Sequence, residues 1–395
     1  MIFCNFRLRP EVKLTIMPVP DIARLIFAII AFLLALLAVL PAPNNLLWKV
    51  SVAITEWGHI FAFIIMLPFF FPWWNSMAGK IGFGFALAGF IISWTPVVRG
   101  YIVAIKLPAQ LEQAFGVHAP EKDIISFKTL FTGASYRKVK FETIQYAKAD
   151  SPEFIIDLYR CGNQGSKSPC VIVVHGGSWE GGDSRQLPAL NSYLAGKGYT
   201  VAAITYRLAP EHIAPAASDD VGKAVEFIKR NSDKFNIDSS KLALLGRSAG
   251  GQVALVAGYS MNDPCIKGII AFYTPADMVW GYSLPGNPLI LDSRRVLRNY
   301  LGGSYEEVPQ NYEKATAMNY VNANTPPTLM IHGQKDEMVA YGHNIRLKKV
   351  LDQYGIKNTI VTLPWATHGF DYNFSGPGAQ ISTYSIEYFL KYIFR

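Results

Sequence analysis

The feature that most restricts the fold of this chain is the segment 244–251 (LLGRSAGG), in which a serine lies between an apolar run and a helical pattern. The apolar run before it predicts a strand, and the pattern after it predicts a helix. The connection must be a tight turn, because a side chain at Gly246 or Gly250 would collide with neighbouring backbone. Such a turn holds the Ser248 hydroxyl beyond the sheet edge and leaves the Ala249 N–H free at a helix N-terminus. Alone, the pattern also fits a glycine-rich turn without chemistry.

Buried apolar runs alternate with helical patterns along the back two thirds of the chain. This alternation predicts an α/β fold, a doubly wound mostly parallel sheet covered by helices on both faces. Two segments of alternating polar and apolar residues come first and predict an antiparallel edge, at Arg137–Tyr146 and Phe154–Arg160. The strands expected after them are Val171–Val174, Val201–Ile204, Leu242–Leu245, Ile269–Phe272, Thr328–Ile331 and Ile360–Leu363, and the expected helices are Leu187–Leu194, Val221–Lys229, Gln252–Tyr259, His343–Leu351 and Ser382–Tyr392.

A pair of glycines follows the strand at 171–174, in the segment His175-Gly-Gly-Ser-Trp179. Consecutive glycines let the backbone approach a bound carbonyl, so that the N–H groups of Gly176 and Gly177 could donate to its oxygen as it becomes an oxyanion. A plain glycine turn is the alternative. A glycine pair of this kind ahead of a Gly-x-Ser-x-Gly turn favours the chemical interpretation.

An aspartate and a histidine follow later strands. Asp336 lies just past the strand at 328–331, and His368 comes shortly after the last strand. Glu337 and Asp371 are alternative acids. Each residue alone would usually be a solvated loop residue. In the order Ser, Asp, His, each past a separate strand, they predict a nucleophile, an acid and a base at one edge of the sheet.

With these motifs, residues 130–395 resemble the α/β-hydrolase superfamily, and most closely the carboxylesterase branch with His-Gly-Gly-x-Trp and Gly-x-Ser-Ala-Gly-Gly. Hormone-sensitive-lipase-like esterases, kynurenine formamidases and isoprenylcysteine methylesterases are similar there. Tyr206–Glu211 and Asp219–Asp220 also match this branch, in which they are mainly structural. The motifs are specific for the fold and the reaction class and weakly specific for the substrate.

The resemblance implies a catalytic triad that needs no cofactor. His368 would take the proton of Ser248, which attacks an ester carbonyl, and Asp336 would hold the imidazole in its working tautomer. Water would then release the acyl group. The N–H groups implied for the oxyanion hole are those of Gly176, Gly177 and Ala249.

Three long apolar runs occupy the front third of the chain, at Ile22–Leu40, Val52–Phe71 and Ile81–Val98. At about 1.5 Å per residue, each is long enough to cross a hydrocarbon core of about 30 Å. We therefore expect an integral, multi-pass membrane protein. A cleaved signal peptide is the alternative for the first run only. Basic residues lie on both flanks of these runs, which leaves the side of the catalytic domain open.

Two features inside these runs have alternative interpretations. Glu56 and His59 share a helix face in the second run, and intramembrane ionisable groups are functional candidates, but these two are also placed to reach the interface. In the third run, Gly82 and Ala86 share a face, as do Gly84 and Ala88. Such spacing favours close packing against another helix, and a lipid-facing helix is the alternative.

We divide the chain into a transmembrane helical domain (1–105), a juxtamembrane connector (106–130) and a catalytic domain (131–395). The segment 277–312 is rich in Trp, Tyr, Pro and Leu and is too long for a simple connection, which predicts a lid or an acyl pocket. A surface insertion is the alternative. The side chains expected to line an apolar pocket are Trp179, Trp280 and Tyr282.

Charge and cysteine content exclude several classes of protein. The net charge is +8, yet no basic block with interleaved aromatic residues is present, so we expect no nucleic-acid partner. The four cysteines form no Cys-x-x-Cys or Cys/His cluster, which predicts no metal site. We expect Cys161 and Cys170 to be free thiols, the commoner outcome, and a disulfide between them is the alternative if their strands form a hairpin.

The leading hypothesis is a membrane-anchored serine carboxylesterase for a lipid-like or small amphiphilic ester, with membrane lipid as its other partner. An amidase or formamidase with the same triad is the alternative within enzymes, because amides and esters share tetrahedral chemistry. A membrane sensor with a hydrolase-like domain is the alternative from another class. The sequence leaves the oligomeric state open.

Overall fold

The structure, a computed structural model, describes residues 19–118, 122–147, 154–162 and 166–395. These residues contain an eight-stranded sheet with the order β1-β2-β4-β3-β5-β6-β7-β8. β1 and β2 are antiparallel to their neighbours, and the other strands are parallel, which confirms the predicted mostly parallel sheet. The strands are β1 (Phe141–Gln145), β2 (Ile155–Tyr159), β3 (Ser168–Val174), β4 (Thr200–Ile204), β5 (Ile237–Arg247), β6 (Ile266–Phe272), β7 (Thr328–Gly333) and β8 (Asn358–Leu363).

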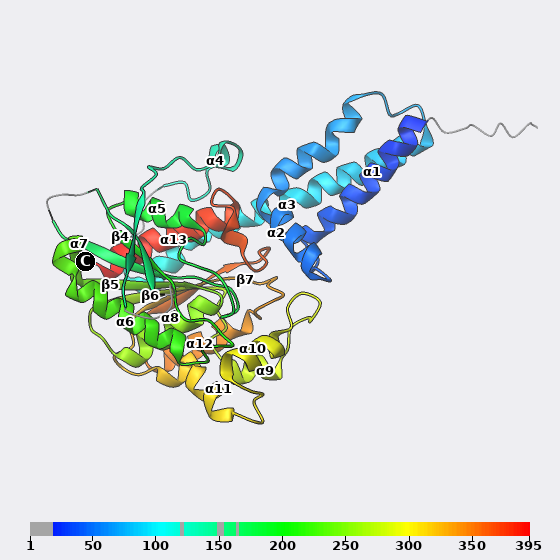
Figure 1. The fold of residues 1–395 in the computed structure, drawn as a ribbon. Helices are drawn as coiled ribbons and strands as arrows, with labels where there is room; N and C mark the ends of the chain where they lie inside the picture. Colours follow the sequence, from blue (N-terminus) through cyan, green and yellow to red (C-terminus); the bar gives the residue numbers. More distant parts are fainter. Residues whose placement is uncertain (1–18, 119–121, 148–153, 163–165) are drawn as a thin grey trace, which may run out of the picture.

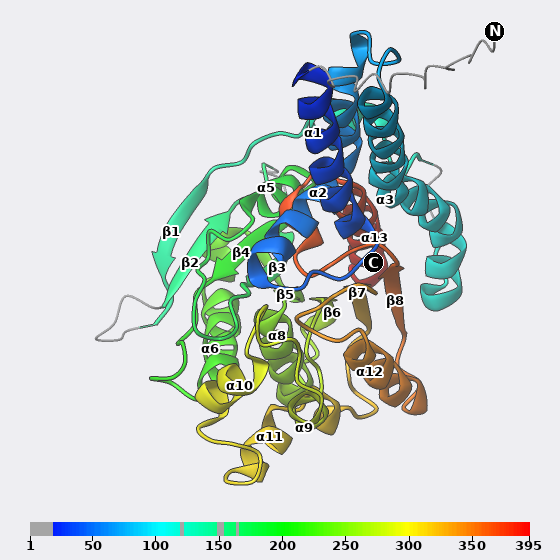
Figure 2. The same ribbon diagram turned by 90° about the vertical axis from the view of Figure 1, so that its right-hand side faces the viewer.

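Helices cover both faces of this sheet (Figures 1 and 2). α6 (Ala216–Arg230), α8 (Ala249–Met261) and α12 (Gly342–Gln353) pack on one face through a fully buried apolar core. α5 (Pro188–Gly196) and α13 (Pro377–Ile393) pack on the other. The central strands are apolar on both sides because both of their faces are buried. The remaining short helices of this part are α4 (Phe127–Thr132), α7 (Ser232–Phe235), α9 (Met278–Ser283), α10 (Ser293–Leu301), α11 (Pro309–Ala315), η3 (Ala317–Tyr320) and η4 (Phe370–Tyr372).

The hairpin that could have paired Cys161 with Cys170 does not form. β4 lies between β2 and β3, so the two cysteines are not on adjacent strands. Cys161, Cys170 and Cys265 are free thiols, and Cys170 is fully buried in β3. The disulfide interpretation is therefore wrong for this pair. Cys4 lies outside the described residues.

The front third forms an arm of long helices that projects from the body (Figure 1). It consists of α1 (Val19–Ala35), η1 (Leu36–Ala38), α2 (Asn45–Met66), η2 (Leu67–Phe70) and α3 (Met77–Phe115). Among the described residues, three helices are long and apolar enough to cross a membrane. Large apolar side chains, such as Ile26, Leu33 and Ile91, are more than half exposed on this arm, as lipid-facing side chains would be.

α3 continues through residues 106–115, where a separate connector was expected. Leu107, Leu111 and Phe115 form a buried stripe against α13 and the edge strand β8. The Gln110 amide also donates to the Ile360 carbonyl of β8 at 2.8 Å. One helix therefore belongs to the arm at its start and covers a sheet edge at its end, which protects an otherwise unpaired strand.

Small residues let α1 approach α3 closely. A Cβ at Gly82 would lie 3.2 Å from the Leu25 Cα, and Ala86 is fully buried on the same face. A Cβ at Gly84 would meet nothing within 4 Å. The close-packing interpretation thus holds for the face with Gly82 and does not extend to Gly84.

We predict that Gly82→Leu destabilises the arm, whereas Gly84→Leu does not. The added side chain at Gly82 would collide with α1 backbone and cost about 1–3 kcal/mol, while the same change at Gly84 enters open space. Thermal unfolding in detergent, followed by tryptophan fluorescence, measures both variants. Equal midpoints for the two would contradict the packing described here.

Candidate active site

Ser248 occupies a strained turn between β5 and α8. Its φ and ψ are 52° and −122°, a region that side-chain-bearing residues rarely adopt. A Cβ at Gly246 would overlap the Gly250 backbone, and a Cβ at Gly250 would overlap the backbone of Val174 and His175. The two glycines therefore let the turn close against the neighbouring strand, and the turn raises the Ser248 hydroxyl above the sheet.

Ser248, His368 and Asp336 come together at the carboxyl ends of β5, β8 and β7. His368 Nε2 lies 3.0 Å from Ser248 Oγ, and His368 Nδ1 lies 2.7 Å from Asp336 Oδ2. The side chain of His368 is 10% exposed and that of Asp336 is 0% exposed. The ring can therefore accept the serine proton at Nε2 while Nδ1–H donates to the carboxylate.

Asp336 is surrounded by hydrogen-bond donors. Oδ1 accepts from the N–H groups of Met338 and Val339 at 2.9 and 2.8 Å. Oδ2 also faces Nε2 of the buried His332 at 3.2 Å, and this nitrogen carries a proton because the Val339 carbonyl accepts from it at 3.0 Å. Burial alone would raise the pKa of Asp336, but His368 and His332 hold that pKa well below its usual range. The carboxylate therefore stays ionised.

The alternative acids, Glu337 and Asp371, have other partners. Asp371 Oδ2 accepts from Arg247 Nε at 2.6 Å, and its Oδ1 accepts from the Tyr273 hydroxyl at 2.6 Å. Glu337 accepts from the Ala42 N–H at 2.9 Å and from the Thr367 hydroxyl. Asp336 is the acid that contacts His368.

The glycine loop after β3 places its N–H groups differently from expectation. The Gly176 N–H donates to Gln186 Oε1 at 2.7 Å, so this N–H already has an acceptor. Gly176 was predicted to donate to the oxyanion, and in the structure its N–H is not available for that role. The N–H groups of Gly177, Ser178 and Ala249 have no acceptor among the described residues. They are the donors available to a carbonyl oxygen beside Ser248.

His175 supports this loop as a neutral ring. Burial lowers its pKa to about 4, and Nδ1–H donates to the Gly176 carbonyl at 2.8 Å. Its ring stacks on Tyr206, whose hydroxyl donates to the His175 carbonyl at 3.0 Å. Arg207 binds Asp220 through two nitrogens, each at 2.8 Å, in agreement with a structural role for this segment.

Two cavities meet at Ser248. The first has a volume of about 220 Å³ and is lined mainly by apolar side chains, which include Trp179, Met278, Leu284, Val296, Leu297 and Met338. The second has a volume of about 210 Å³ and contains His368 and the glycine loop; Trp48, Tyr273, Leu291 and Tyr372 form its other walls. An ester carbonyl at Ser248 can thus extend one group into each cavity.

Of the three pocket residues expected from the sequence, only Trp179 lines these cavities. The Trp179 ring stacks on Tyr300 and its Nε1 donates to Gln252. Trp280 instead packs edge-on against His343, and Tyr282 packs against Tyr312. Both lie on α9, where Met278 and Gly281 face the first cavity in their place.

Sequence reasoning missed Trp48, His332 and Gln186 as residues of this site. Trp48 lies at the start of α2, far from the catalytic motifs in sequence. His332 lies inside an apolar strand and Gln186 in a loop without a motif. No local pattern identifies them, because their role depends on contacts between distant segments.

The sequence of the body is similar to the sequences of known proteins. Residues 156–351 match the family model described as BD-FAE. Esterase LipC of Mycobacterium tuberculosis is 30% identical over 266 residues, which cover 62% of this chain and 64% of LipC. The isoprenylcysteine alpha-carbonyl methylesterase ICME of Arabidopsis thaliana is 24% identical over 232 residues, which cover 55% of this chain and 54% of ICME. The chain thus spans between about half and just under two thirds of these relatives.

Solved structures share the fold. A bacterial heroin esterase superposes with a TM-score of 0.57 and 19% identity, covering 73% of this chain and 92% of its own. A truncated carbohydrate esterase from gut microbiota gives a TM-score of 0.56 and 21% identity, covering 66% and 99%. The body therefore has the α/β-hydrolase fold of these solved esterases.

We predict that Asp336→Asn lowers kcat by a factor on the order of 10⁴, because an amide favours the wrong imidazole tautomer. Asp352→Asn, on the exposed surface of α12, is the matched control and should retain wild-type kcat. Steady-state hydrolysis of a p-nitrophenyl ester at pH 8 measures both. A fall of less than tenfold in Asp336→Asn would exclude Asp336 as the orienting acid.

Proposed function

We propose that this chain is a serine carboxylesterase that its N-terminal helices anchor in a membrane. The observation that carries the proposal is the hydrogen-bonded series from Ser248 Oγ through His368 to Asp336, beside N–H groups that have no acceptor. A nucleophile, a base, a buried acid and free donors at one point have little use in a binding module. The esterase relatives favour an ester over an amide substrate.

The geometry assigns each step to an atom. His368 Nε2 takes the Ser248 proton as Oγ attacks the carbonyl carbon, and the resulting oxyanion accepts hydrogen bonds from Gly177, Ser178 and Ala249. The imidazolium, stabilised by Asp336, then gives its proton to the leaving alcohol. Water repeats the sequence on the acyl-enzyme and releases the acid.

The position of the imidazole assigns the two cavities. The leaving alcohol must lie within hydrogen-bond reach of His368 Nε2, because it receives its proton from this atom. Since His368 lines the cavity that contains Trp48, this cavity receives the alcohol. The apolar cavity beside Trp179 then receives the acyl group. Trp48, from the membrane arm, thereby becomes a wall of the leaving-group site.

The connection between α1 and α2 is bound tightly to the catalytic loops, which supports a role for the arm in the site. Lys335 Nζ donates to the Leu37 carbonyl and to Ser51 Oγ. Asn45 donates to the carbonyls of Leu289 and Ile290 through its backbone and its side chain, at 2.9 and 3.0 Å. These bonds hold Trp48 against the active site.

Glu56 and His59 strengthen the same interface. Both are fully buried, and they contact the body instead of reaching solvent. Glu56 Oε2 accepts from the Gly378 N–H at the start of α13 at 3.2 Å. His59 Nε2 lies 2.8 Å from the Leu130 carbonyl. Their place in the fold is thus structural.

The arm also supports the proposal of an amphiphilic ester substrate. The α1–α2 connection lies at the end of the arm next to the body, while the α2–α3 connection lies at its far end (Figure 1). If the helices cross a bilayer, the catalytic cavities face its surface. An ester with an apolar part that partitions into the bilayer would reach Ser248 from there.

We predict that Ser248→Ala abolishes both labelling by a fluorophosphonate probe and ester hydrolysis. The variant removes the only atom that forms the covalent intermediate, while Ser240→Ala, on the exposed start of β5, keeps wild-type labelling and rate. In-gel fluorescence and an assay with paired ester and amide substrates measure the outcome. Retained hydrolysis in Ser248→Ala would refute the proposed nucleophile, and faster cleavage of the matched amide would refute the ester preference.

We predict that Trp48→Ala relaxes selectivity for the alcohol and leaves selectivity for the acyl group unchanged. Removal of the indole enlarges the leaving-group cavity, so kcat/KM for a cyclohexyl ester relative to a methyl ester should rise about tenfold. The ratio for hexanoate against acetate methyl esters should stay within twofold. Trp74→Ala, 55% exposed at the far end of the arm, is the control. A change confined to the acyl series would reverse the assignment of the cavities.

A further inference from the structure

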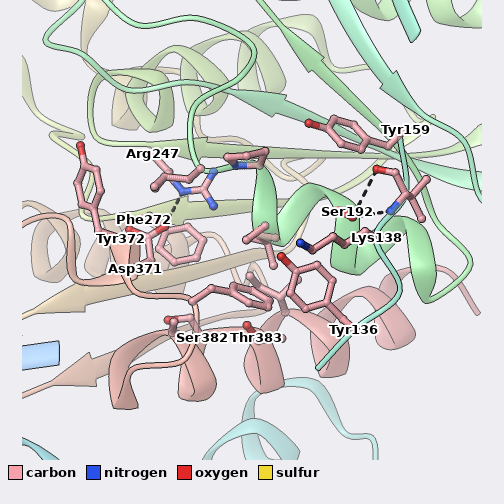
Figure 3. Close-up of a pocket in the computed structure, with 18 of the residues that line it drawn as sticks. Tyr136, Lys138, Tyr159, Ser192, Arg247, Phe272, Asp371, Tyr372, Ser382 and Thr383 are labelled. Carbon is pink, nitrogen blue, oxygen red and sulfur yellow. Dashed lines mark hydrogen bonds and ion pairs between the residues drawn. The ribbon is translucent and has the colours of Figure 1, made fainter. Parts of the chain in front are cut away.

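A third and larger cavity lies behind the nucleophile, on the face of the sheet covered by α5 and α13 (Figure 3). Its volume is about 660 Å³, within the usual range for small-molecule sites. Much of the wall is aromatic or aliphatic. The apolar lining includes Tyr136, Phe272, Leu190, Phe374 and Ile386.

One buried cation points into this cavity. The side chain of Arg247 is 3% exposed, and its guanidinium lies over the Phe272 ring at 5.3 Å. Its Nε donates to Asp371, as the dashed line in Figure 3 shows. The two terminal nitrogens, with four N–H donors, have no acceptor among the residues that the structure describes. A buried guanidinium with unused donors is the group that binds a carboxylate or a phosphate through two bonds.

The charge around the cavity is positive. Asp371 is the sole acid among the described residues that line it, and both of its oxygens are already bonded, one to Arg247 and one to Tyr273. Burial raises the pKa of Tyr273 well above its usual range, so this phenol remains a neutral donor. Lys138 and Lys140 add two charges at the rim, and the Lys138 ammonium points into the cavity in Figure 3.

We propose that this cavity binds a single-chain anionic amphiphile, with its oxyanion head between Arg247 and Lys138 and its alkyl chain along α5 and α13. The head matches the unused donors of Arg247 and the positive rim, and the chain matches the apolar wall. A fatty carboxylate has this chemistry, and so does a monoalkyl phosphate. A neutral chain lacks the group that the two cations would bind.

This site is separate from the catalytic cavities but adjoins one of them. Leu187, Arg247 and Tyr372 line both this cavity and the leaving-group cavity. Because Arg247 precedes Ser248 directly, an oxyanion on its guanidinium would lie behind the nucleophile. The inference does not need the proposed esterase activity, because binding is measured by labelling and competition and not by hydrolysis.

The test is photoaffinity labelling of the full chain, phosphonylated at the active site and held in dodecyl maltoside. The probe is a twelve-carbon carboxylate with a diazirine near the chain end, and the adducts are mapped by mass spectrometry. We expect labelling of α5, α13 or Phe374, and competition by dodecanoate or dodecyl phosphate. The neutral twelve-carbon detergent, present in excess, should not prevent it. The relative potency of the two competitors identifies the preferred head group.

Variants sharpen the test without altering the catalytic residues. Lys138→Glu, at an exposed position, should weaken competition by dodecanoate about tenfold, and Lys128→Glu on α4 should leave it unchanged. Thr383→Trp, which would fill the cavity from α13, should abolish labelling. Equal competition by dodecanol and dodecanoate would overturn the proposal, as would labelling that is insensitive to both Lys138→Glu and Thr383→Trp. Failure of serine labelling in the same protein would bear on the proposed function alone.

Discussion

Asp336 lies between two residues that bind the N-terminal helical arm. Lys335 donates to the Leu37 carbonyl, and Glu337 accepts from the Ala42 N–H. Glu337 also accepts from the hydroxyl of Thr367, the residue before His368. The loops that carry the acid and the base are therefore held by the same contacts that dock the arm. The atoms of a catalytic triad must lie within a few tenths of an ångström of their working positions. The geometry of the proposed triad therefore depends on how the arm is docked.

The second constraint is the turn at Ser248. Its positive φ is possible only because two glycines allow the backbone of β5, β3 and α8 to approach closely. The same approach brings the loop after β3 over the serine, where Gln186 fixes the Gly176 N–H and leaves the next two N–H groups free. Arg247, the residue before Ser248, lines both the larger cavity and the leaving-group cavity. One turn thus carries both the nucleophile and the cation of the proposed anion site.

Much of the body could be predicted from the sequence because its signals are local. Apolar runs identify buried strands, and Gly-x-Ser-x-Gly after such a run requires a turn of one kind. The placing of Ser248, Asp336 and His368 after separate strands also follows from local patterns. The insertion of β4 between β2 and β3 does not, because strand order is set by long-range packing. The alternative of a hairpin that would pair Cys161 with Cys170 is excluded for this reason.

The features of the site that could not be predicted from the sequence depend on contacts between residues that lie far apart along the chain. Trp48 reaches the cavity from a helix whose apolar run indicated only a membrane span, and Glu56 binds the start of α13. The occupied N–H of Gly176 depends on a glutamine ten residues along the chain, in a loop without a motif. α3 continues past its apolar run because a buried stripe on its later turns packs against β8 and α13.

An experimental structure of the phosphonylated protein tests the central claim most directly. The account predicts a covalent bond from phosphorus to Ser248 Oγ, with the phosphoryl oxygen within 3.2 Å of the N–H groups of Gly177 and Ala249. It also predicts the alkoxy group in the cavity walled by Trp48. Phosphorus on another residue, or a phosphoryl oxygen directed away from the loop after β3, would contradict it.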